Sequence, residues 1–155
     1  MSGFIGEFPC TMDAKGRFNV PAALLKQVPA KEQKRFVVHR GIEKHLVLYT
    51  KKEWEKISAE INELNLYISK NRDFIRKFNR GATEVELDTT SRLLLPKSLT
   101  DYAGINRDIV LFAYGNRVEI WSENGYAKML KEDKDDFAAL AEEVMGKKNN
   151  REDVS

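Results

Sequence analysis

The sequence predicts a mainly β protein with helices (α+β), in which two copies of one unit close a small barrel or sandwich with pseudo-two-fold symmetry. The main observation is that Asp, Arg and Pro at four-residue steps occur twice, 75 residues apart. They are Asp13, Arg17 and Pro21 in the first copy and Asp88, Arg92 and Pro96 in the second. The chain has only four prolines, so two of them in register are hard to obtain by chance. A unit of about 45 residues buries too little surface to be stable alone, which favours one shared core over two independent domains.

Each copy is expected to fold as strand, tight loop, strand, short helix, strand, turn and strand. Over residues 84–87 glutamate alternates with Val85 and Leu87, the period of two that is typical of a half-buried strand. The turns at 40–41 and 115–116 contain the residue types that hairpins need. The predicted segments are a first repeat over 7–54, a helical connection over 55–82, a second repeat over 83–126, a C-terminal helix over 127–146 and a disordered tail over 147–155.

The helices are predicted from apolar residues at steps of three and four. In the connection these residues are Trp54, Ile57, Ile61, Leu64 and Ile68. An interruption at 71–73 and a second short helix ending near Gly81 are expected after them. In the C-terminal helix, broken around 132–136, they are Tyr126, Met129, Leu130, Phe137, Leu140, Ala141 and Val144. Any excess apolar face on these helices would be a subunit contact.

The composition predicts one compact cytoplasmic body. Apolar residues make up 42% of the 155, enough for a sizeable core, and charged residues make up 32%. The apolar stretches are too short to span a bilayer and the first residues lack a leader pattern, so no membrane partner is expected. The lone Cys10 excludes an internal disulfide, which fits a reducing compartment.

The distribution of charge says more than the net charge of +2, which is too small to diagnose nucleic-acid binding. Residues 13–40 hold seven basic side chains against two acidic ones, whereas residues 123–155 hold nine acidic against six basic. Such asymmetry hints at an end of the molecule that faces a polyanion. A basic patch is also ordinary solvated surface, and composition does not decide between the two.

The first repeated loop has a definite chemistry. Asp13 is expected to accept backbone N–H bonds from the turn and to steer Arg17 by a charge-assisted hydrogen bond. Gly16 permits a positive φ angle. The result is a rigid loop that holds Lys15 and Arg17 outward, and the planar fork of arginine can bind either a phosphate or a guanine edge at two points.

The second loop has lost two of these residues. Thr89, Thr90 and Ser91 stand where the first loop has Ala14, Lys15 and Gly16. The Asp88–Arg92 pair could hold the fold or contact a ligand, and the residues favour neither. The second loop is therefore expected to be the weaker contact, with Arg92 contributing more to stability than Arg17 does.

An enzyme is an alternative to a protein that binds nucleic acid through these loops. His39 and His45 are the only histidines, and the chain lacks metal-ligand spacings, a Gly-x-Ser-x-Gly motif and a P-loop. We therefore expect no enzymatic activity, no catalytic residues, no metal, no cofactor and no small-molecule substrate.

The sequence resembles the MraZ family, over roughly residues 3 to 145. The first signature lies at 6–8, 12–17 and 20–22, and the second at 86–88, 92 and 95–96. MraZ proteins are similar to the AbrB and SpoVT regulators, so the resemblance implies a duplicated AbrB/SpoVT-like swapped-hairpin barrel. The family is described as ring-forming, nucleoid-associated transcriptional regulators. They bind short repeated G-rich elements upstream of the division and cell-wall gene cluster.

The resemblance implies that double-stranded DNA is the partner and that the chain forms a homo-oligomer, a closed ring. The family's DNA-contacting loop falls on Asp13, Lys15, Gly16 and Arg17, with Arg17 the leading candidate, and its second motif on Asp88 and Arg92. A ring-forming scaffold without sequence-specific DNA binding is the alternative. The sequence leaves open the operator, the sign of regulation and the number of subunits.

Overall fold

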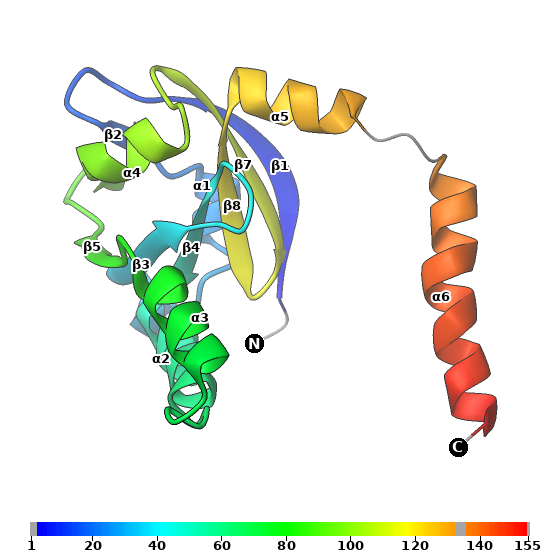
Figure 1. Ribbon diagram of the computed structural model, residues 1–155. Coiled ribbons are helices and arrows are strands. Elements are labelled where there is room, and N and C mark those ends of the chain that lie inside the picture. Colours follow the sequence, from blue (N-terminus) through cyan, green and yellow to red (C-terminus); the bar gives the residue numbers. More distant parts are fainter. Residues whose placement is uncertain (1–2, 133–135, 155) are drawn as a thin grey trace. The chain divides into compact units, whose positions relative to one another are not determined.

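The computed structural model describes residues 3–132 and 136–154 (Figure 1). The chain divides into two compact units, one running to Gly125 and the other beginning at Tyr126. The larger unit contains both copies of the repeat, and the smaller one is helical.

The two copies have the same order of elements, as the repeat predicted. The first copy contains β1 (Phe4–Thr11), β2 (Arg17–Asn19), α1 (Ala22–Leu25), a short 3-10 helix (Ala30–Glu32), β3 (Arg35–Arg40) and β4 (Leu46–Thr50). The second contains β5 (Thr83–Glu86), β6 (Arg92–Leu94), α4 (Lys97–Tyr102), β7 (Asp108–Gly115) and β8 (Arg117–Ser122). Both short helices follow a proline, Pro21 or Pro96, whose fixed φ suits the start of a helix.

The described strands form a six-stranded antiparallel sheet and a two-stranded ribbon. The sheet order is β1-β7-β8-β4-β3-β5. Read from either edge, the first strand of one copy is followed by the third and fourth strands of the other copy. The first strand of each copy pairs with the third strand of the other, β1 with β7 and β5 with β3. The ribbon pairs β2 with β6, one strand from each copy. Neither copy can complete its sheet without the other.

One core unites the copies. Phe18 and Leu93, which face each other across the ribbon, are 1% and 0% exposed. The inward residues of the sheet pack in the same cluster, and they include Phe36, Val38, Leu46, Leu48, Ile109, Leu111, Val118 and Ile120. The shared core follows from the strand pairing, because each strand places alternate side chains on one face.

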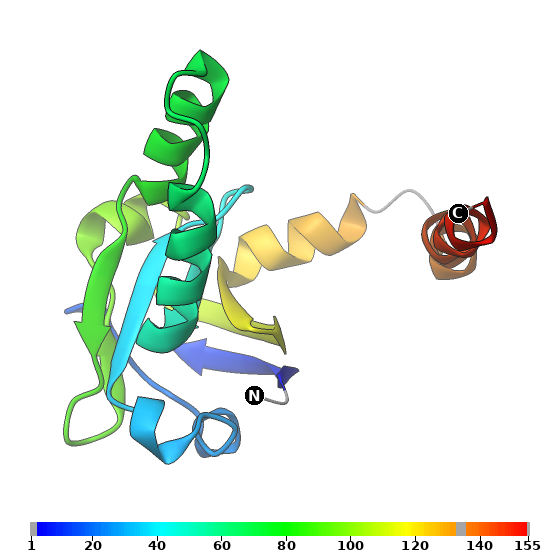
Figure 2. The ribbon, with the colours of Figure 1, turned by 90° about the horizontal axis from the view of Figure 1, so that it is seen from below.

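The connection between the copies differs from the prediction. Helix α2 (Lys51–Asn62) ends before Leu64, and α3 (Ser69–Asn79) includes 71–73, which the sequence predicted to be an interruption. The two helices lie side by side in Figures 1 and 2, with the rings of Trp54 and Phe78 stacked at 5.4 Å. The break falls at 63–68, where the N–H of Tyr67 donates to Oδ1 of Asn65 and Nη1 of Arg72 donates to the carbonyl of Leu66.

The C-terminal segment is broken around 132–136, as predicted, but its end differs from the prediction. It forms α5 (Glu123–Lys131) and α6 (Phe137–Val154), with 133–135 outside the described residues. Residues 147–154 are helical, not a disordered tail, because extending a helix already begun at an alanine-rich start costs less than nucleating one. Within the described residues no helix is long and apolar enough to cross a membrane.

Candidate nucleic-acid interface

The outer face of the β2–β6 ribbon carries an arginine from each copy. Arg17 lies opposite Leu94, and Arg92 lies opposite Asn19. Because successive side chains of a strand point to opposite faces, these four project outward while the residues between them are buried. Arg17 and Arg92 are diagonal neighbours, a relation that separates residues by about 7–8 Å. The ribbon therefore brings the two arginines of the repeat together.

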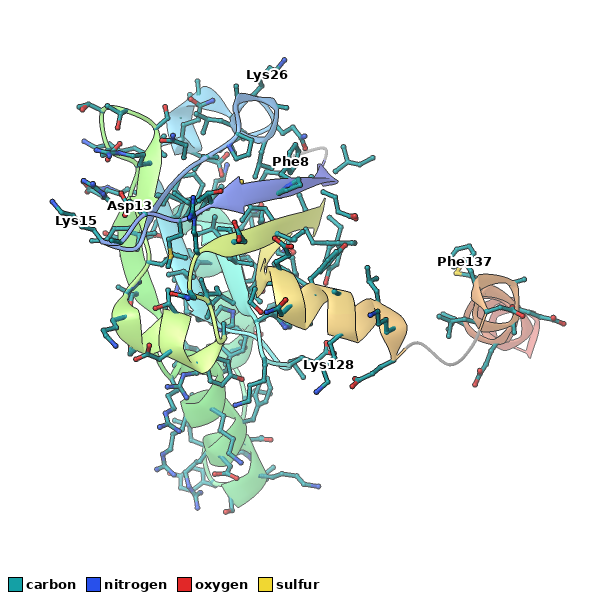
Figure 3. The ribbon with its side chains drawn as sticks, turned by 90° about the horizontal axis from the view of Figure 1, so that it is seen from above. Phe8, Asp13, Lys15, Lys26, Lys128 and Phe137 are labelled. Carbon is teal, nitrogen blue, oxygen red and sulfur yellow. The ribbon has the colours of Figure 1, made fainter. Side chains whose placement is uncertain are left out.

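The first loop is closed by the carboxylate of Asp13. Its Oδ1 accepts hydrogen bonds from the backbone N–H groups of Lys15 and Arg17, both at 2.9 Å, and its Oδ2 accepts one from Nε of Arg17 at 2.9 Å. These bonds, with the backbone N–H of Arg17 the largest cause, lower the pKa of Asp13. Lys15 is exposed and extends away from the loop tip (Figure 3). The loop thus presents an ammonium group beside a fixed guanidinium group.

Gly16 is required by the backbone of this loop. Its φ is +90°, and a Cβ at this position would lie 2.9 Å from the carbonyl oxygen of Leu95. The carbonyl of Gly16 accepts a hydrogen bond from the N–H of Leu95 at 2.8 Å. The loop therefore packs directly on the strand end of the other copy, at a distance that only glycine allows.

The second loop repeats the geometry of the first. Oδ1 of Asp88 accepts hydrogen bonds from the backbone N–H groups of Thr90 and Arg92, both at 2.9 Å, and Oδ2 accepts one from Nε of Arg92 at 3.0 Å. Ser91 has a φ of +62°, the same left-handed region as Gly16. The hydroxyl of Thr90 donates a further bond to Asp88 at 2.9 Å. These bonds, the backbone N–H of Arg92 first, lower the pKa of Asp88 to about 2.

The loss of glycine and lysine therefore leaves the second loop's shape unchanged. The side chains of Arg17 and Arg92 are 30% and 32% exposed, and their bonds to the carboxylates have nearly the same length. The sequence led us to expect that Arg92 contributes more to stability than Arg17. The geometry gives no reason for such a difference.

Sequence reasoning missed two residues at this face, Asn106 and Arg107. They line an open depression of about 650 Å³ whose other walls are Thr11, Met12, Asp13, Ala14, Arg17, Asn19 and Arg92. The backbone N–H of Met12 donates to the carbonyl of Arg107 at 2.7 Å, which fixes Arg107 beside the first loop. A third arginine thus joins the two of the repeat. Its place depends on the pairing of β1 with β7, which the motif spacing does not reveal.

The two histidines lie inside the fold. His39 is 4% exposed, and burial lowers its pKa to about 4. The ring of His45 stacks on Trp121 at 4.5 Å. Among the described residues, no group of three or more His, Cys, Asp or Glu side chains could hold a metal ion.

The comparisons with known proteins agree on one family. The family model described as "MraZ protein, putative antitoxin-like" matches residues 4–77 and 78–148. The transcriptional regulator MraZ of Christiangramia forsetii is 47% identical over 147 residues, which cover 94% of this chain and 95% of that protein. The protein of the same name from Flavobacterium psychrophilum is 42% identical over 153 residues, 98% of both. The one from Moorella thermoacetica is 34% identical over 142 residues, 92% of this chain and 96% of the relative. Each matched segment contains one Asp-x-x-x-Arg loop.

Proposed function

The chain belongs to the MraZ family, and we propose that it is a sequence-specific DNA-binding transcriptional regulator. Its targets are the tandem G-rich elements, upstream of the division and cell-wall gene cluster, that the family resemblance implies. The observation that carries the proposal is the outer face of the β2–β6 ribbon, where two arginines are held in the same geometry beside an exposed lysine.

The hydrogen bonds of the arginines suit them to read guanine. In both pairs the carboxylate accepts from Nε, and within the described residues no hydrogen bond involves the terminal nitrogens of Arg17 or Arg92. Those nitrogens are therefore free to donate to O6 and N7 of a guanine, which is worth about 1–3 kcal/mol of discrimination per pair. The carboxylate removes the cost of fixing the side chain, since Nε is already held. Asp13 and Asp88 act by positioning the arginines.

Lys15 has a different role in this proposal. An ammonium group is a compact point charge that suits a phosphate and carries no base specificity. Gly16 lets the backbone of the first loop pack closely on Leu95, which holds the loop in place. Thr90 supplies no charge at the matching place in the second loop, so the first loop is the stronger contact.

The proposed assembly is a closed ring of identical subunits. One chain offers a single pair of loops, whereas a ring would engage tandem elements together and gain roughly 10² or more in affinity. The supporting observation is a group of exposed apolar residues, Leu66, Tyr67 and Ile68 between α2 and α3 and Phe74 on α3. The helices at 51–68 and 126–145 are the proposed contacts, through their apolar side chains. Light scattering that gives the monomer mass of 17.8 kDa at micromolar concentration would exclude the ring.

The proposal places the protein in the cytoplasm, on the nucleoid, with no enzymatic activity and no cofactor. A ring-forming scaffold without sequence-specific DNA binding is the alternative, and the exposed apolar residues at 66–68 and 74 fit it equally well.

The test is a footprint on the DNA upstream of the protein's own gene, followed by salt titration. We expect protection of repeated G-rich elements and a log–log salt slope that grows by about 0.9 for each phosphate contact. Equal affinity for the protected element and its shuffled sequence would favour the scaffold. Affinity unchanged between roughly 50 and 200 mM salt would exclude phosphate binding.

A further inference from the structure

A second basic surface lies away from the ribbon face. It is an open groove of about 910 Å³ between the segment at 29–35 and the first turns of α2. Its charged lining consists of Lys31, Lys34, Arg35, Lys51, Lys52 and Lys56 with Glu32, Glu53 and Glu55. We call this the lysine groove.

Three of these cations have acidic partners. The ion pairs are Arg35 with Glu86 at 3.9 Å, Lys51 with Glu84, and Lys56 with Glu53 at 3.2 Å. Lys31, Lys34 and Lys52 are exposed, and no carboxylate of the described residues lies within ion-pair distance of them. Like charges so placed repel one another, and the lining carboxylates that offset this repulsion are Glu53, Glu55 and Glu32, which accepts from the Thr50 hydroxyl at 3.1 Å.

The second copy shows that the fold does not need three of these cations. Arg35 opens β3, and Asp108 opens the matching strand β7. Lys51 and Lys52 begin α2, whereas Glu123 and Asn124 begin α5. The same strand and helix starts thus form with acidic or neutral residues. Arg35 and Lys51 have ion pairs to β5, so the cations that call for a reason other than folding are the unpaired ones, Lys31, Lys34 and Lys52.

The groove begins at the base of the second loop. The backbone N–H of Leu87, the residue before Asp88, donates to the carbonyl of Lys34 at 2.8 Å. Figure 2 shows the β5–β6 connection and the segment that precedes β3 at the same end of the molecule. The matching bond in the other half, from Met12 to Arg107, places Arg107 beside the first loop. Leu87 thus links the second loop to the segment that forms one wall of the groove, and Arg107 lies at the matching place in the other half.

We propose that the lysine groove binds the phosphate backbone of duplex DNA that flanks the element read by the ribbon. This inference rests on the proposed function. Lysine ammonium groups suit phosphates as point charges and carry no sequence information. The groove would therefore add affinity and salt dependence without changing base preference. In the second copy the matching positions are less basic, because only Arg107 and Lys128 are cations there.

The test compares two triple variants. The groove variant combines Lys31→Gln, Lys34→Gln and Lys52→Asn, the last being the residue that the second copy has at Asn124. The control variant combines Lys26→Gln, Lys70→Gln and Lys77→Gln, which removes the same charge from exposed positions outside the groove. Salt titrations use the footprinted element with flanking sequence, the element trimmed to its protected bases, and a shuffled duplex. Melting temperature and mass by light scattering are measured for both variants.

On the flanked duplex we expect the groove variant to lose about 0.9 in the salt slope for each lost phosphate contact, and the control variant to lose little. The trimmed element should bind both variants alike, and the preference for the element over the shuffled duplex should be unchanged. Equal slopes for the two variants on the flanked duplex would overturn the inference. A parent protein that prefers no sequence would overturn the proposed function instead, and the slope on the shuffled duplex would still decide whether the groove binds phosphate.

Discussion

The two Asp-x-x-x-Arg loops share the hydrogen bonds between their aspartate and arginine but differ in the residues between them. In each, one carboxylate oxygen accepts two backbone N–H groups and the other accepts Nε of the arginine. The loops differ at Lys15 against Thr90 and at Gly16 against Ser91. The carboxylate and the antiparallel ribbon therefore determine the shape of the loop, and the residues between Asp and Arg determine what the loop presents to a ligand.

The comparison also separates two kinds of positive φ. Ser91 at +62° is close to the centre of the left-handed region, which an L-residue can occupy at a cost of about 1–2 kcal/mol. Gly16 at +90° lies further out and has the carbonyl of Leu95 against it. The first loop needs its glycine, and the second tolerates a side chain.

The largest expected effect concerns the arginines. Arg17→Ala should abolish specific DNA binding, because each engaged subunit loses about 1–3 kcal/mol of base discrimination. Arg92→Ala should weaken specific binding less, because no lysine holds the duplex beside it. Both variants should keep nearly the parent melting temperature, since exposed ion pairs add little to stability.

Operator affinity and melting temperature, measured for both variants, show whether the two arginines contribute equally to DNA binding and to stability. If Arg92→Ala loses binding as fully as Arg17→Ala, the shared geometry outweighs Lys15 and the loops are equivalent. If Arg92→Ala alone lowers the melting temperature, the second loop serves the fold, as the sequence led us to expect.

The glycine and serine positions should differ in stability. Gly16→Ala adds a Cβ at a strained φ and 2.9 Å from a backbone oxygen, so the free energy of unfolding should fall by at least about 1–2 kcal/mol. Ser91→Gly relieves strain but adds chain entropy to the unfolded state, so it should change stability by less than about 1 kcal/mol. Urea unfolding of the two variants measures both. Equal destabilisation by the two substitutions would contradict the difference between the loops that the φ angles indicate.

The comparison also shows what the sequence could predict. The register of Asp13, Arg17 and Pro21 with their second-copy counterparts was enough for the order of elements and the shared core. The left-handed φ of Ser91 was not predicted although Ser91 aligns with Gly16, because only a few per cent of non-glycine residues adopt a positive φ. The position of Arg107 was missed because it depends on a strand pairing between the copies.

The helices show a different limit. Apolar residues at Leu64 and Ile68 continue the period of α2 past its real end at Asn62, because exposed apolar residues in a connection look the same as a helix face. The arginine face could be predicted from the motifs alone, whereas the lysine groove required the fold.

Exchanging Lys15 and Thr90 tests whether the charge at the loop tip sets the difference in affinity. Lys15→Thr should weaken binding to all sequences alike and lower the salt slope by about 0.9 per engaged subunit, and Thr90→Lys should raise it by as much. Both substitutions keep the backbone N–H that bonds to the aspartate. Salt titrations on the footprinted element and a shuffled duplex measure the change. A gain from Thr90→Lys on the footprinted element alone would mean that this position reads bases.

The smallest expected effect is on the carboxylates themselves. The pKa of Asp88 is about 2, below its usual value of 3.8, so the folded state binds fewer protons and the stability from this group is lost as the pH falls from about 4 to about 2. Thr90→Ala should raise the pKa of Asp88, because it removes the hydroxyl that donates to the carboxylate. Lys15→Ala should leave the lowered pKa of Asp13 in place, because only the backbone N–H of Lys15 bonds to that carboxylate. NMR titration of the aspartate carboxyl carbons measures both pKa values. If both substitutions raise the pKa of their aspartate equally, the side chain at the loop tip acts through charge or solvation rather than through the threonine hydroxyl, and the two loops are held by the same bonds.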